Sequence, residues 1–162
     1  MADSINIVGL MSGTSVDGLD ICYISFSKNK IEDYEIINCK TIDYPKDLKN
    51  ELINVIYSEN EKIKDLDLKF GEFIGHSVNK FISENKLPLP DLISSHGHTV
   101  FHEPNIGKTL QIGNGSIIYK ITGIQTVNNF REQDVKLGGQ GAPLVPIGDK
   151  LLFKKFKYCL NL

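Results

Sequence analysis

The sequence has no tryptophan, few cysteines and no long apolar run. Its apolar stretches fall far short of the roughly 18 to 20 residues of a membrane-spanning helix, so no such helix is predicted. The formal net charge is only −2, which provides no basic field to bind nucleic acid or an anionic membrane surface. The first residues, MADSINIVGL, lack the basic region and apolar core of a secretory signal. We therefore expect a cytoplasmic protein that binds neither nucleic acid nor membrane.

The three cysteines are Cys22, Cys39 and Cys159. Their number is odd, and their spacing matches no metal-binding motif. We expect buried, reduced thiols, as is usual in a cytoplasmic protein.

The composition is that of an ordinary globular protein. The 162 residues are 41% hydrophobic and 23% charged, close to the average of folded domains. This length suits one domain, or one lobe of something larger. A chain of this size buries roughly two-thirds of its unfolded surface, enough for a real core.

The first part of the chain predicts three strands and two helices. Runs rich in β-branched and aromatic residues occupy positions 5–10, 19–27 and 34–41, and a polar link after the second fits a hairpin turn. A three-stranded antiparallel meander is therefore predicted. A helix beginning at Pro45 and ending near Tyr57 is expected next, since proline suits a first helical turn. Apolar positions three and four residues apart predict a longer helix at 62–85.

Two glycines lie one turn apart on this longer predicted helix, Gly71 and Gly75. Each costs about 1 kcal/mol of helix propensity relative to alanine. A close approach of the helix to the sheet would explain them; the alternative is a weak point in the helix.

The second part of the chain predicts alternating short elements. A buried strand at 92–95 runs into a loop of small residues, and 109–127 reads as a short strand, a turn, a short helix and another strand. We expect a long polar, glycine-rich loop at 128–143, a helix at 146–156 and a further strand beginning at 157. Three strands followed by helices and β/α units is the α/β order of the ribonuclease-H-like lobe found in sugar kinases, actin and the heat-shock ATPases. Alternation alone also permits another α/β fold.

The loop GLMSGTSVDGLD, between the first two predicted strands, has the composition of an anion-binding turn. Gly13 and Gly18 can adopt backbone conformations closed to other residues, and successive N–H groups in such a turn can hold an anion. Hydroxyl donors and hard carboxylate ligands for Mg²⁺ accompany them: Ser12, Thr14, Ser15, Asp17 and Asp20. The loop suits a nucleotide phosphate with its metal, although it lacks the lysine of a Walker A motif. The alternative is a polar hairpin loop whose side chains cap their own backbone.

Two further polar loops follow predicted strands, where ligands of α/β sheets gather. The second loop holds His96, His98 and His102. The chain lacks a cysteine or carboxylate cluster to complete a zinc site, so zinc is disfavoured. His96, at a strand end, is expected to be hydrogen-bonded or in contact with a polar ligand, whereas His102-Glu103-Pro104 is interpreted as a solvated turn. The third loop carries Arg131, whose rigid guanidinium could clamp a carboxylate or form a surface ion pair with a neighbouring acidic residue.

In this order, the segments GLMSGTSVDGLD, SSHGHTVFHEP, TLQIGNG, ITGIQTVNNFR and DVKLGGQGAPLVP resemble the anhydro-N-acetylmuramic acid kinase family. The resemblance covers nearly the whole chain, and MSGTS-x-DG-x-D and GGQGAPLVP are its most specific motifs. It implies that residues 1–155 form an N-terminal ribonuclease-H-like lobe. Residues 156–162 would then be the truncated first strand of a second lobe.

The resemblance also implies an activity, in the recycling of cell-wall peptidoglycan. ATP phosphorylates 1,6-anhydro-N-acetylmuramic acid while water opens its anhydro bridge, giving N-acetylmuramic acid 6-phosphate and ADP. By resemblance the ATP site comprises Gly13, Thr14, Ser15, Val16, Asp17, Gly18, Leu19 and Asp20, with Asp17 and Asp20 at Mg²⁺. The sugar would lie nearer His96, His98 and Arg131, and we hypothesise that Arg131 meets its lactyl carboxylate. The family also suggests a homodimer.

The sequence departs from the family pattern at several positions. His98 stands where the family commonly has glutamine, Asn129 where it has aspartate, and Gly148-Asp149 where it often has Phe-His. The family's general-base aspartate lies in an Asp-Thr-Gly-Pro-Gly loop of the second lobe, expected beyond Leu162. We therefore expect little or no kinase activity from this chain by itself. The alternative function is a catalytically inactive, kinase-like binding module or truncated product.

Overall fold

A mixed six-stranded sheet forms the centre of the molecule, with the spatial order β3-β2-β1-β4-β5 and with β6 beside β4. The computed structural model describes residues 4–30, 32–141, 144–158 and 160. The strands are β1 (Ser4–Ser12), β2 (Leu19–Ser27), β3 (Tyr34–Ile42), β4 (Leu92–Glu103), β5 (Lys108–Ile112) and β6 (Thr126–Val127). The helices are α1 (Lys46–Asn54), α2 (Asn60–Glu84), α3 (Gly115–Thr122), α4 (Phe130–Lys136) and α5 (Leu144–Leu152), with short 3-10 turns η1 (Val55–Tyr57) and η2 (Pro104–Ile106).

The pairing of the strands confirms the predicted fold class. β1, β2 and β3 form an antiparallel meander, and the chain then returns through α1 and α2 to β4, which runs parallel to β1. The first half of β4 pairs with β6 in parallel, and the second half pairs with β5 antiparallel. This is a three-stranded meander followed by β/α units, the arrangement of a lobe of the sugar-kinase and actin class.

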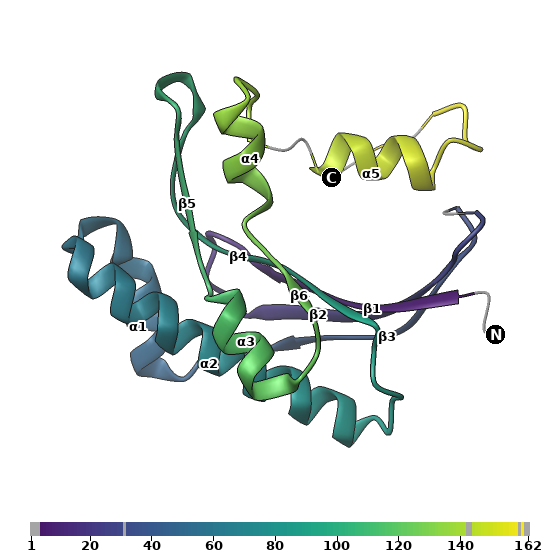
Figure 1. Cartoon of the computed structure of the whole chain (residues 1–162), viewed down its shortest axis with the longest axis horizontal. Coiled ribbons are helices and arrows are strands. Elements are labelled where there is room, and N and C mark those ends of the chain that lie inside the picture. The colour runs from purple at the N-terminus through teal and green to yellow at the C-terminus, as the bar shows by residue number, and fades with distance from the viewer. Residues whose placement is uncertain (1–3, 31, 142–143, 159, 161–162) are drawn as a thin grey trace.

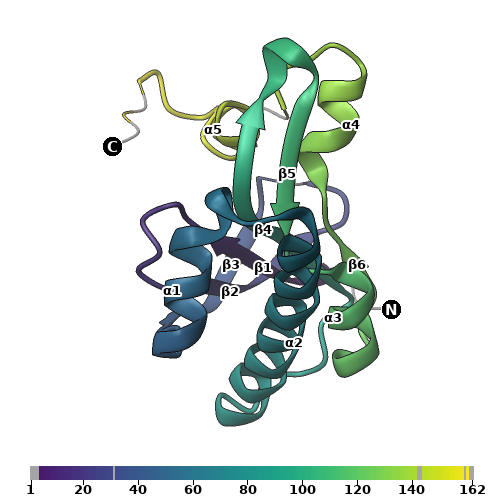
Figure 2. The same cartoon turned by 90° about the vertical axis from the view of Figure 1, so that its left-hand side faces the viewer.

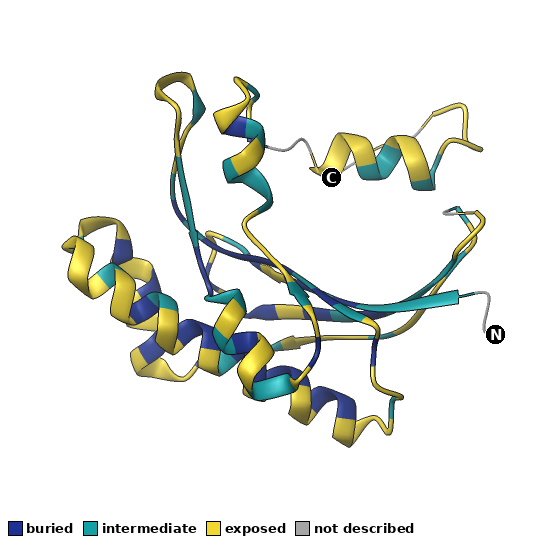
Figure 3. Cartoon of the chain, in the orientation of Figure 1, coloured by how far each residue is buried: buried dark blue, intermediate teal, exposed yellow. Residues whose placement is uncertain are grey.

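The helices lie on both sides of this sheet. Helices α1, α2 and α3 cover one face, and α4 and α5 lie on the other side (Figures 1 and 2). The core forms between the sheet and the apolar stripe of α2, which the sequence predicts from its spacing; the buried positions of both appear in dark blue in Figure 3. Its fully buried side chains include Val8, Ile21, Tyr23 and Ile93 of the sheet and Phe70, Ile74 and Val78 of α2.

Gly71 and Gly75 allow close packing of α2 against α3 and the turn before it, rather than against the sheet. A Cβ on Gly71 would lie 2.9 Å from the backbone oxygen of Asn114, and one on Gly75 would lie 2.9 Å from Cβ of Ile121. The prediction that these glycines contact the sheet is therefore wrong, although the predicted close approach is present. The two glycines form the surface of α2 on which α3 and the turn before it pack.

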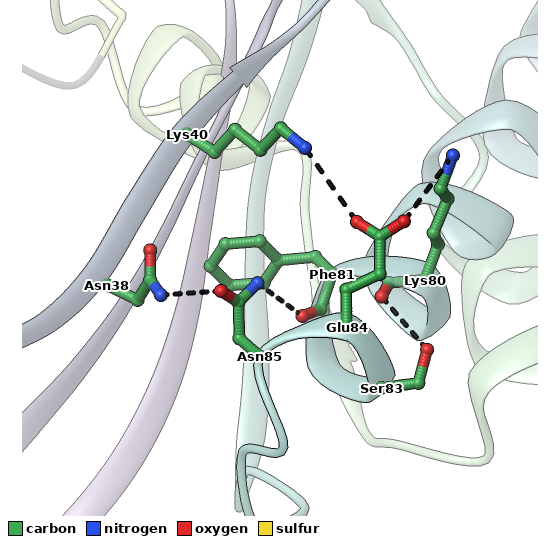
Figure 4. A network of polar contacts seen from close by, with 7 residues as sticks. All are labelled: Asn38, Lys40, Lys80, Phe81, Ser83, Glu84 and Asn85. Atoms are coloured by element: carbon green, nitrogen blue, oxygen red, sulfur yellow. Dashed lines mark hydrogen bonds and ion pairs between the residues drawn. The ribbon is translucent and has the colours of Figure 1, made fainter.

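The C-terminal end of α2 is held to the edge strand β3 by polar side chains (Figure 4). The side-chain nitrogen of Asn38 donates to Oδ1 of Asn85 at 2.8 Å, and Asn85 in turn donates to the Phe81 carbonyl at 2.8 Å. Lys40 forms an ion pair with Glu84 at 3.7 Å. These contacts fix the far end of the helix against the meander.

Two segments predicted as loops are regular structure. The strand at 92–95 continues to Glu103, so His96, His98 and His102 lie on β4, because this half of the strand finds a partner in β5. Within the segment 128–143, residues 130–136 form α4, which buries only Val135. Pro143 and its neighbour at 142 lie outside the described residues. The helix predicted at 146–156 is α5, two residues earlier at its start.

The described residues after Leu152 belong to no helix or strand. Of the strand predicted at the end of the chain, positions 159, 161 and 162 lie outside the described residues. The assignment of 156–162 to a second lobe therefore stays a prediction. Among the described residues, no helix is both long and apolar enough to cross a bilayer.

Cys22 and Cys39 face each other across β2 and β3, with Cα atoms 4.2 Å apart, and are joined by a disulfide. The prediction of reduced thiols is wrong for this pair. The reason is the register of the meander, which sets the two residues directly opposite and which their spacing in the sequence does not reveal. Cys159 lies outside the described residues.

Candidate functional site

The hairpin of residues 12–18 connects β1 to β2 and is one wall of the candidate site. The Val16 amide donates to the Gly13 carbonyl at 3.1 Å, which closes a tight turn. Val16 carries the positive φ, +51°, and neither Gly13 nor Gly18 has one, so the conformational reason expected for these glycines is wrong. A β-branched residue rarely adopts this conformation. The Val16 side chain is buried in the core, and its burial offsets the backbone strain.

Gly18 is required by space rather than by its torsion angles. A Cβ at this position would lie 2.5 Å from Cγ2 of Thr41 and 3.0 Å from the Ile42 carbonyl oxygen. The end of β3 therefore passes directly against the hairpin. This close approach fixes the point at which the hairpin rejoins the sheet.

Asp17 and Asp20 are both exposed and each accepts a hydrogen bond from a hydroxyl. Ser15 donates to Asp17 Oδ1 at 2.9 Å, and Thr41 donates to Asp20 Oδ1 at 2.6 Å. In the part of the chain that the structure describes, no group of three histidine, cysteine or acidic residues could hold a metal. Mg²⁺ is commonly held by one or two carboxylates together with substrate phosphates, so these carboxylates would need a phosphate to complete a site. Neither Asp17 nor Asp20 is among the residues that line the cavity between the hairpin and Arg131.

His96 and Arg131 form the opposite wall. Arg131 Nε donates to Nε2 of the buried His96 at 2.9 Å, and its Nη1 donates to the Gly141 carbonyl at 2.7 Å. Burial lowers the pKa of His96 from 6.5, against the opposing effect of its bond to the Gly97 carbonyl, and the Arg131 cation lowers it further. The neutral imidazole accepts from Arg131 at Nε2 and donates from Nδ1 to Gly97 at 3.1 Å. Two of the five guanidinium N–H donors are thus committed.

The glycine run after α4 packs against His102 and Asp134. The Gly141 amide donates to Asp134 Oδ2 at 2.8 Å, while His102 Nε2 lies 3.0 Å from the Gln140 carbonyl. Gly141 has φ +89°, and a Cβ there would lie 2.3 Å from Cε1 of His102. The run is therefore held to β4 as well as to α4, and it places the carbonyl that orients Arg131.

Between these walls lies a cavity of about 380 Å³. The hairpin residues Gly13, Thr14 and Ser15 line one side, and His96 and Arg131 line the other. The structure thus brings together residues that the sequence places in three separate segments. A space of this size, with hydroxyl groups on one side and a cation on the other, can take a polar or anionic small molecule.

His98 does not reach this cavity. It is 3% exposed, and it lines a second, smaller cavity of about 230 Å³ together with Thr14, Ser15 and Val16. Burial lowers the pKa of His98 from 6.5, and the nearby His96 lowers it further, against the opposing effect of a hydrogen bond to the Ser12 backbone. His98 therefore lies on the core side of the hairpin. Its position does not support contact with a ligand in the larger cavity.

Three residues that sequence reasoning did not assign contribute to the site. Thr99 and His102 line the larger cavity from β4. The pairing register shifts between Thr99 and Phe101, so simple alternation along the strand would not have indicated both residues. Tyr44 supports the hairpin from behind through two hydrogen bonds. Its contact to Ser12 spans 32 positions, and no local pattern predicts it.

The sequence model of the family described as anhydro-N-acetylmuramic acid kinase matches residues 5–161. The chain belongs to the anhydro-N-acetylmuramic acid kinase family. The hairpin and Arg131 both lie within the matched residues.

Individual relatives named anhydro-N-acetylmuramic acid kinase agree with this family. The protein of Acaryochloris marina (strain MBIC 11017) is 42% identical over 147 residues, covering 86% of this chain and 38% of its own length. Those of Actinobacillus pleuropneumoniae serotype 5b (strain L20) and Bacillus cereus (strain G9842) are 38% and 35% identical, covering 86% and 91% of this chain and 39% and 42% of their own lengths. The chain spans about two fifths of the length of these kinases.

Proposed function

We propose that this chain is the N-terminal lobe of an ATP-dependent kinase that opens and phosphorylates 1,6-anhydro-N-acetylmuramic acid, yielding N-acetylmuramic acid 6-phosphate and ADP. Membership of the family supports the reaction. The observation that carries the proposal is the cavity between the hairpin and Arg131, where small residues and hydroxyls face a cation. Peptidoglycan recycling in the cytoplasm is the setting that the family implies.

The hairpin is the proposed site of the ATP phosphates. Phosphoryl transfer depends on donors and metal placed around the charge of the transferring group. Thr14 and Ser15 supply hydroxyls at the cavity wall. Asp17 and Asp20 would hold Mg²⁺, which would neutralise phosphate charge when bound. Gly18 keeps the hairpin against β3 so that its backbone is presented at one fixed angle.

Arg131 is the proposed partner of the lactyl carboxylate of the sugar. Its Nε and Nη1 contacts to His96 and Gly141 leave three N–H donors of the guanidinium, and the side chain lines the cavity. A carboxylate is a strong, oriented acceptor for such donors. His96 holds the guanidinium plane, and this gives His96 a supporting role in sugar binding.

Turnover of ATP with 1,6-anhydro-N-acetylmuramic acid and Mg²⁺ tests the proposal. The chain alone is expected to give little or no product, because the general base belongs to the second lobe proposed beyond Leu162 and its loss costs about 10²–10⁴-fold. A fusion of this lobe to the second lobe of the Bacillus cereus relative should form N-acetylmuramic acid 6-phosphate. Arg131→Ala in the fusion should raise KM for the sugar far more than KM for ATP.

Two results would overturn parts of this proposal. A folded fusion that forms no sugar phosphate would favour the alternative, a catalytically inactive binding module. An Arg131→Ala variant with unchanged sugar KM would remove the carboxylate assignment alone. Sedimentation of the active fusion would also decide whether the proposed homodimer forms.

A further inference from the structure

A buried chain of three side chains ties the two ends of the hairpin together. The Tyr44 hydroxyl lies 2.8 Å from Ser12 Oγ, at the start of the hairpin, and 2.8 Å from the Gly18 carbonyl oxygen, at its end. Ser12 Oγ lies 2.9 Å from Nδ1 of His98. Ser12 and His98 are 1% and 3% exposed. Water therefore has little access to these polar atoms, and they must satisfy one another.

The positions of the hydrogens in this chain follow from counting donors. The Gly18 carbonyl can only accept, so the single Tyr44 hydrogen is donated to it. The Tyr44 oxygen must then accept from the Ser12 hydroxyl, since two oxygens at 2.8 Å without a hydrogen between them would repel. The Ser12 hydrogen is thereby used. His98 must donate to Ser12 from Nδ1, and its Nε2 is left as the unprotonated nitrogen of the neutral ring.

This assignment agrees with the surroundings of each group. Burial raises the pKa of Tyr44 to about 12, so the hydroxyl keeps the hydrogen that it donates. The rings of Phe70 and His98 are nearly perpendicular, with their centroids 6.4 Å apart. The imidazole thus packs against α2 while its Nδ1 contacts Ser12 of the hairpin.

We propose that His98, as its Nδ1–H tautomer, is a positioning residue that holds both ends of hairpin 12–18 through Ser12 and Tyr44. A glutamine amide at this position can donate to Ser12 in the same way, so His98→Gln keeps the donor that the proposal requires. The effect of His98 on ATP rests on the proposed function of the hairpin, whereas the tautomer and the hairpin geometry do not.

The tautomer is tested on the unaltered chain 1–162. Two-bond ¹⁵N–¹H correlation spectra of the histidine-labelled protein near neutral pH distinguish Nδ1–H from Nε2–H imidazole. The expected result is a protonated Nδ1 and an unprotonated Nε2 for His98, assigned by the signal lost in His98→Gln. An Nε2–H tautomer at His98 would overturn the proposal, whatever the chain does with ATP.

The positioning role is tested by hydrogen exchange of the Val16 amide, which closes the turn of the hairpin. His98→Leu and Tyr44→Phe should speed this exchange about tenfold through loss of one or two buried hydrogen bonds, while His98→Gln should retain the slow rate. Val78→Ala is the matched control, because it removes core packing on α2 without touching the hairpin chain. Equal acceleration in Val78→Ala and His98→Leu would show a merely structural role and overturn the proposal.

The consequence for ATP is measured in the fusion protein. His98→Leu should raise KM for ATP about five- to tenfold with a smaller change in kcat, and His98→Gln should restore it. Unchanged KM in His98→Leu, with accelerated Val16 exchange, would overturn the link to ATP. A fusion that binds no ATP would instead overturn the proposed function and leave the first two tests standing.

Discussion

Single residues of the hairpin are constrained by space, and Gly18→Ala tests this at the residue scale. The added methyl would meet Thr41 and the backbone of Ile42, and backbone cannot swing away as a side chain can. We expect a loss of about 1–3 kcal/mol in the free energy of unfolding, typical of overpacking. Gly13→Ala is the matched control, since its Cβ would approach only the Ser15 hydroxyl, at 3.3 Å. Urea unfolding of both variants measures the difference, and equal stability would contradict the steric account.

Two buried imidazoles make the stability depend on pH. The pKa values of His96 and His98 both lie below 6.5, mainly because burial disfavours the charged ring. The unfolded chain therefore binds more protons than the folded one as the pH falls below 6.5. Stability is complete above this value and declines as the pH drops toward the lowered pKa values. This decline should precede the titration of the carboxyl groups.

Urea midpoints at about pH 7.5 and about pH 5.5 measure this decline. The free energy of unfolding should fall between these values in the unaltered chain and fall less in His98→Gln, which lacks one of the two buried imidazoles. The charged groups near these rings are Arg131, which contacts His96 from α4, and Asp17 and Asp20, which lie near Tyr44 on the hairpin side. A higher stability at the lower pH would contradict the assignment of both rings as neutral.

At the scale of elements, the contact between α2 and α3 explains two glycines in a helix. Alanine at Gly75 gains about 1 kcal/mol of helix propensity but must displace Ile121, whose Cβ, Cγ2 and Cδ1 would lie 2.9–3.2 Å away. Alanine at Gly71 would meet the Asn114 backbone at 2.9 Å. We expect Gly71→Ala to be the more destabilising change, by about 1–3 kcal/mol, because its obstacle is main chain.

A double-mutant cycle separates these two causes. Gly75→Ala should cost less in an Ile121→Ala background than in the unaltered chain, with a coupling of about 0.5–3 kcal/mol. The relief is partial because Cβ of residue 121 remains. Gly71→Ala should show no such relief in the same background. If both glycine variants stabilise the chain, propensity outweighs packing and α3 is free to move away.

The elements also show which parts of the fold the sequence could predict. The meander and α2 follow from strong local signals: alternating or continuous apolar residues, and apolar positions three and four apart. Helix α4 has one buried residue, Val135, in seven positions, so it carries no apolar periodicity to read. The second half of β4, HTVFHE, contains two histidines and a glutamate, and it is a strand because β5 pairs with it.

Some features of the candidate site could also be predicted from the sequence, and others could not. Small residues and carboxylates of the hairpin indicate their chemistry locally, and the sequence also identifies His96 and Arg131. Their mutual hydrogen bond spans 35 positions and depends on how α4 folds. The positive φ at Val16 could not be predicted from residue type, because glycine is the residue that usually adopts it. Val16 adopts this conformation because its side chain is buried in the core, which is a tertiary effect.

For the whole molecule, the position of the core predicts what can be removed. All members of the main buried cluster lie between Val8 and Ile124. Helix α5 buries no residue, and Leu144, Val145 and Ile147 of its apolar side are 41–58% exposed. An ion pair between exposed Lys154 and Glu32 connects the segment after α5 to the β2–β3 turn. Such pairs contribute little to stability.

Deletion of residues 142–162 should therefore leave the lobe folded and nearly as stable. We expect the free energy of unfolding of the chain 1–141 to differ from that of the full chain by less than about 1 kcal/mol. The denaturant slope should stay nearly the same, because it follows the surface exposed when the core opens. The hydrogen bond from Arg131 to the Gly141 carbonyl remains in the shortened chain, so the candidate site should keep its wall. A loss of several kcal/mol would show instead that α5 packs on this lobe and would place it within the folding unit.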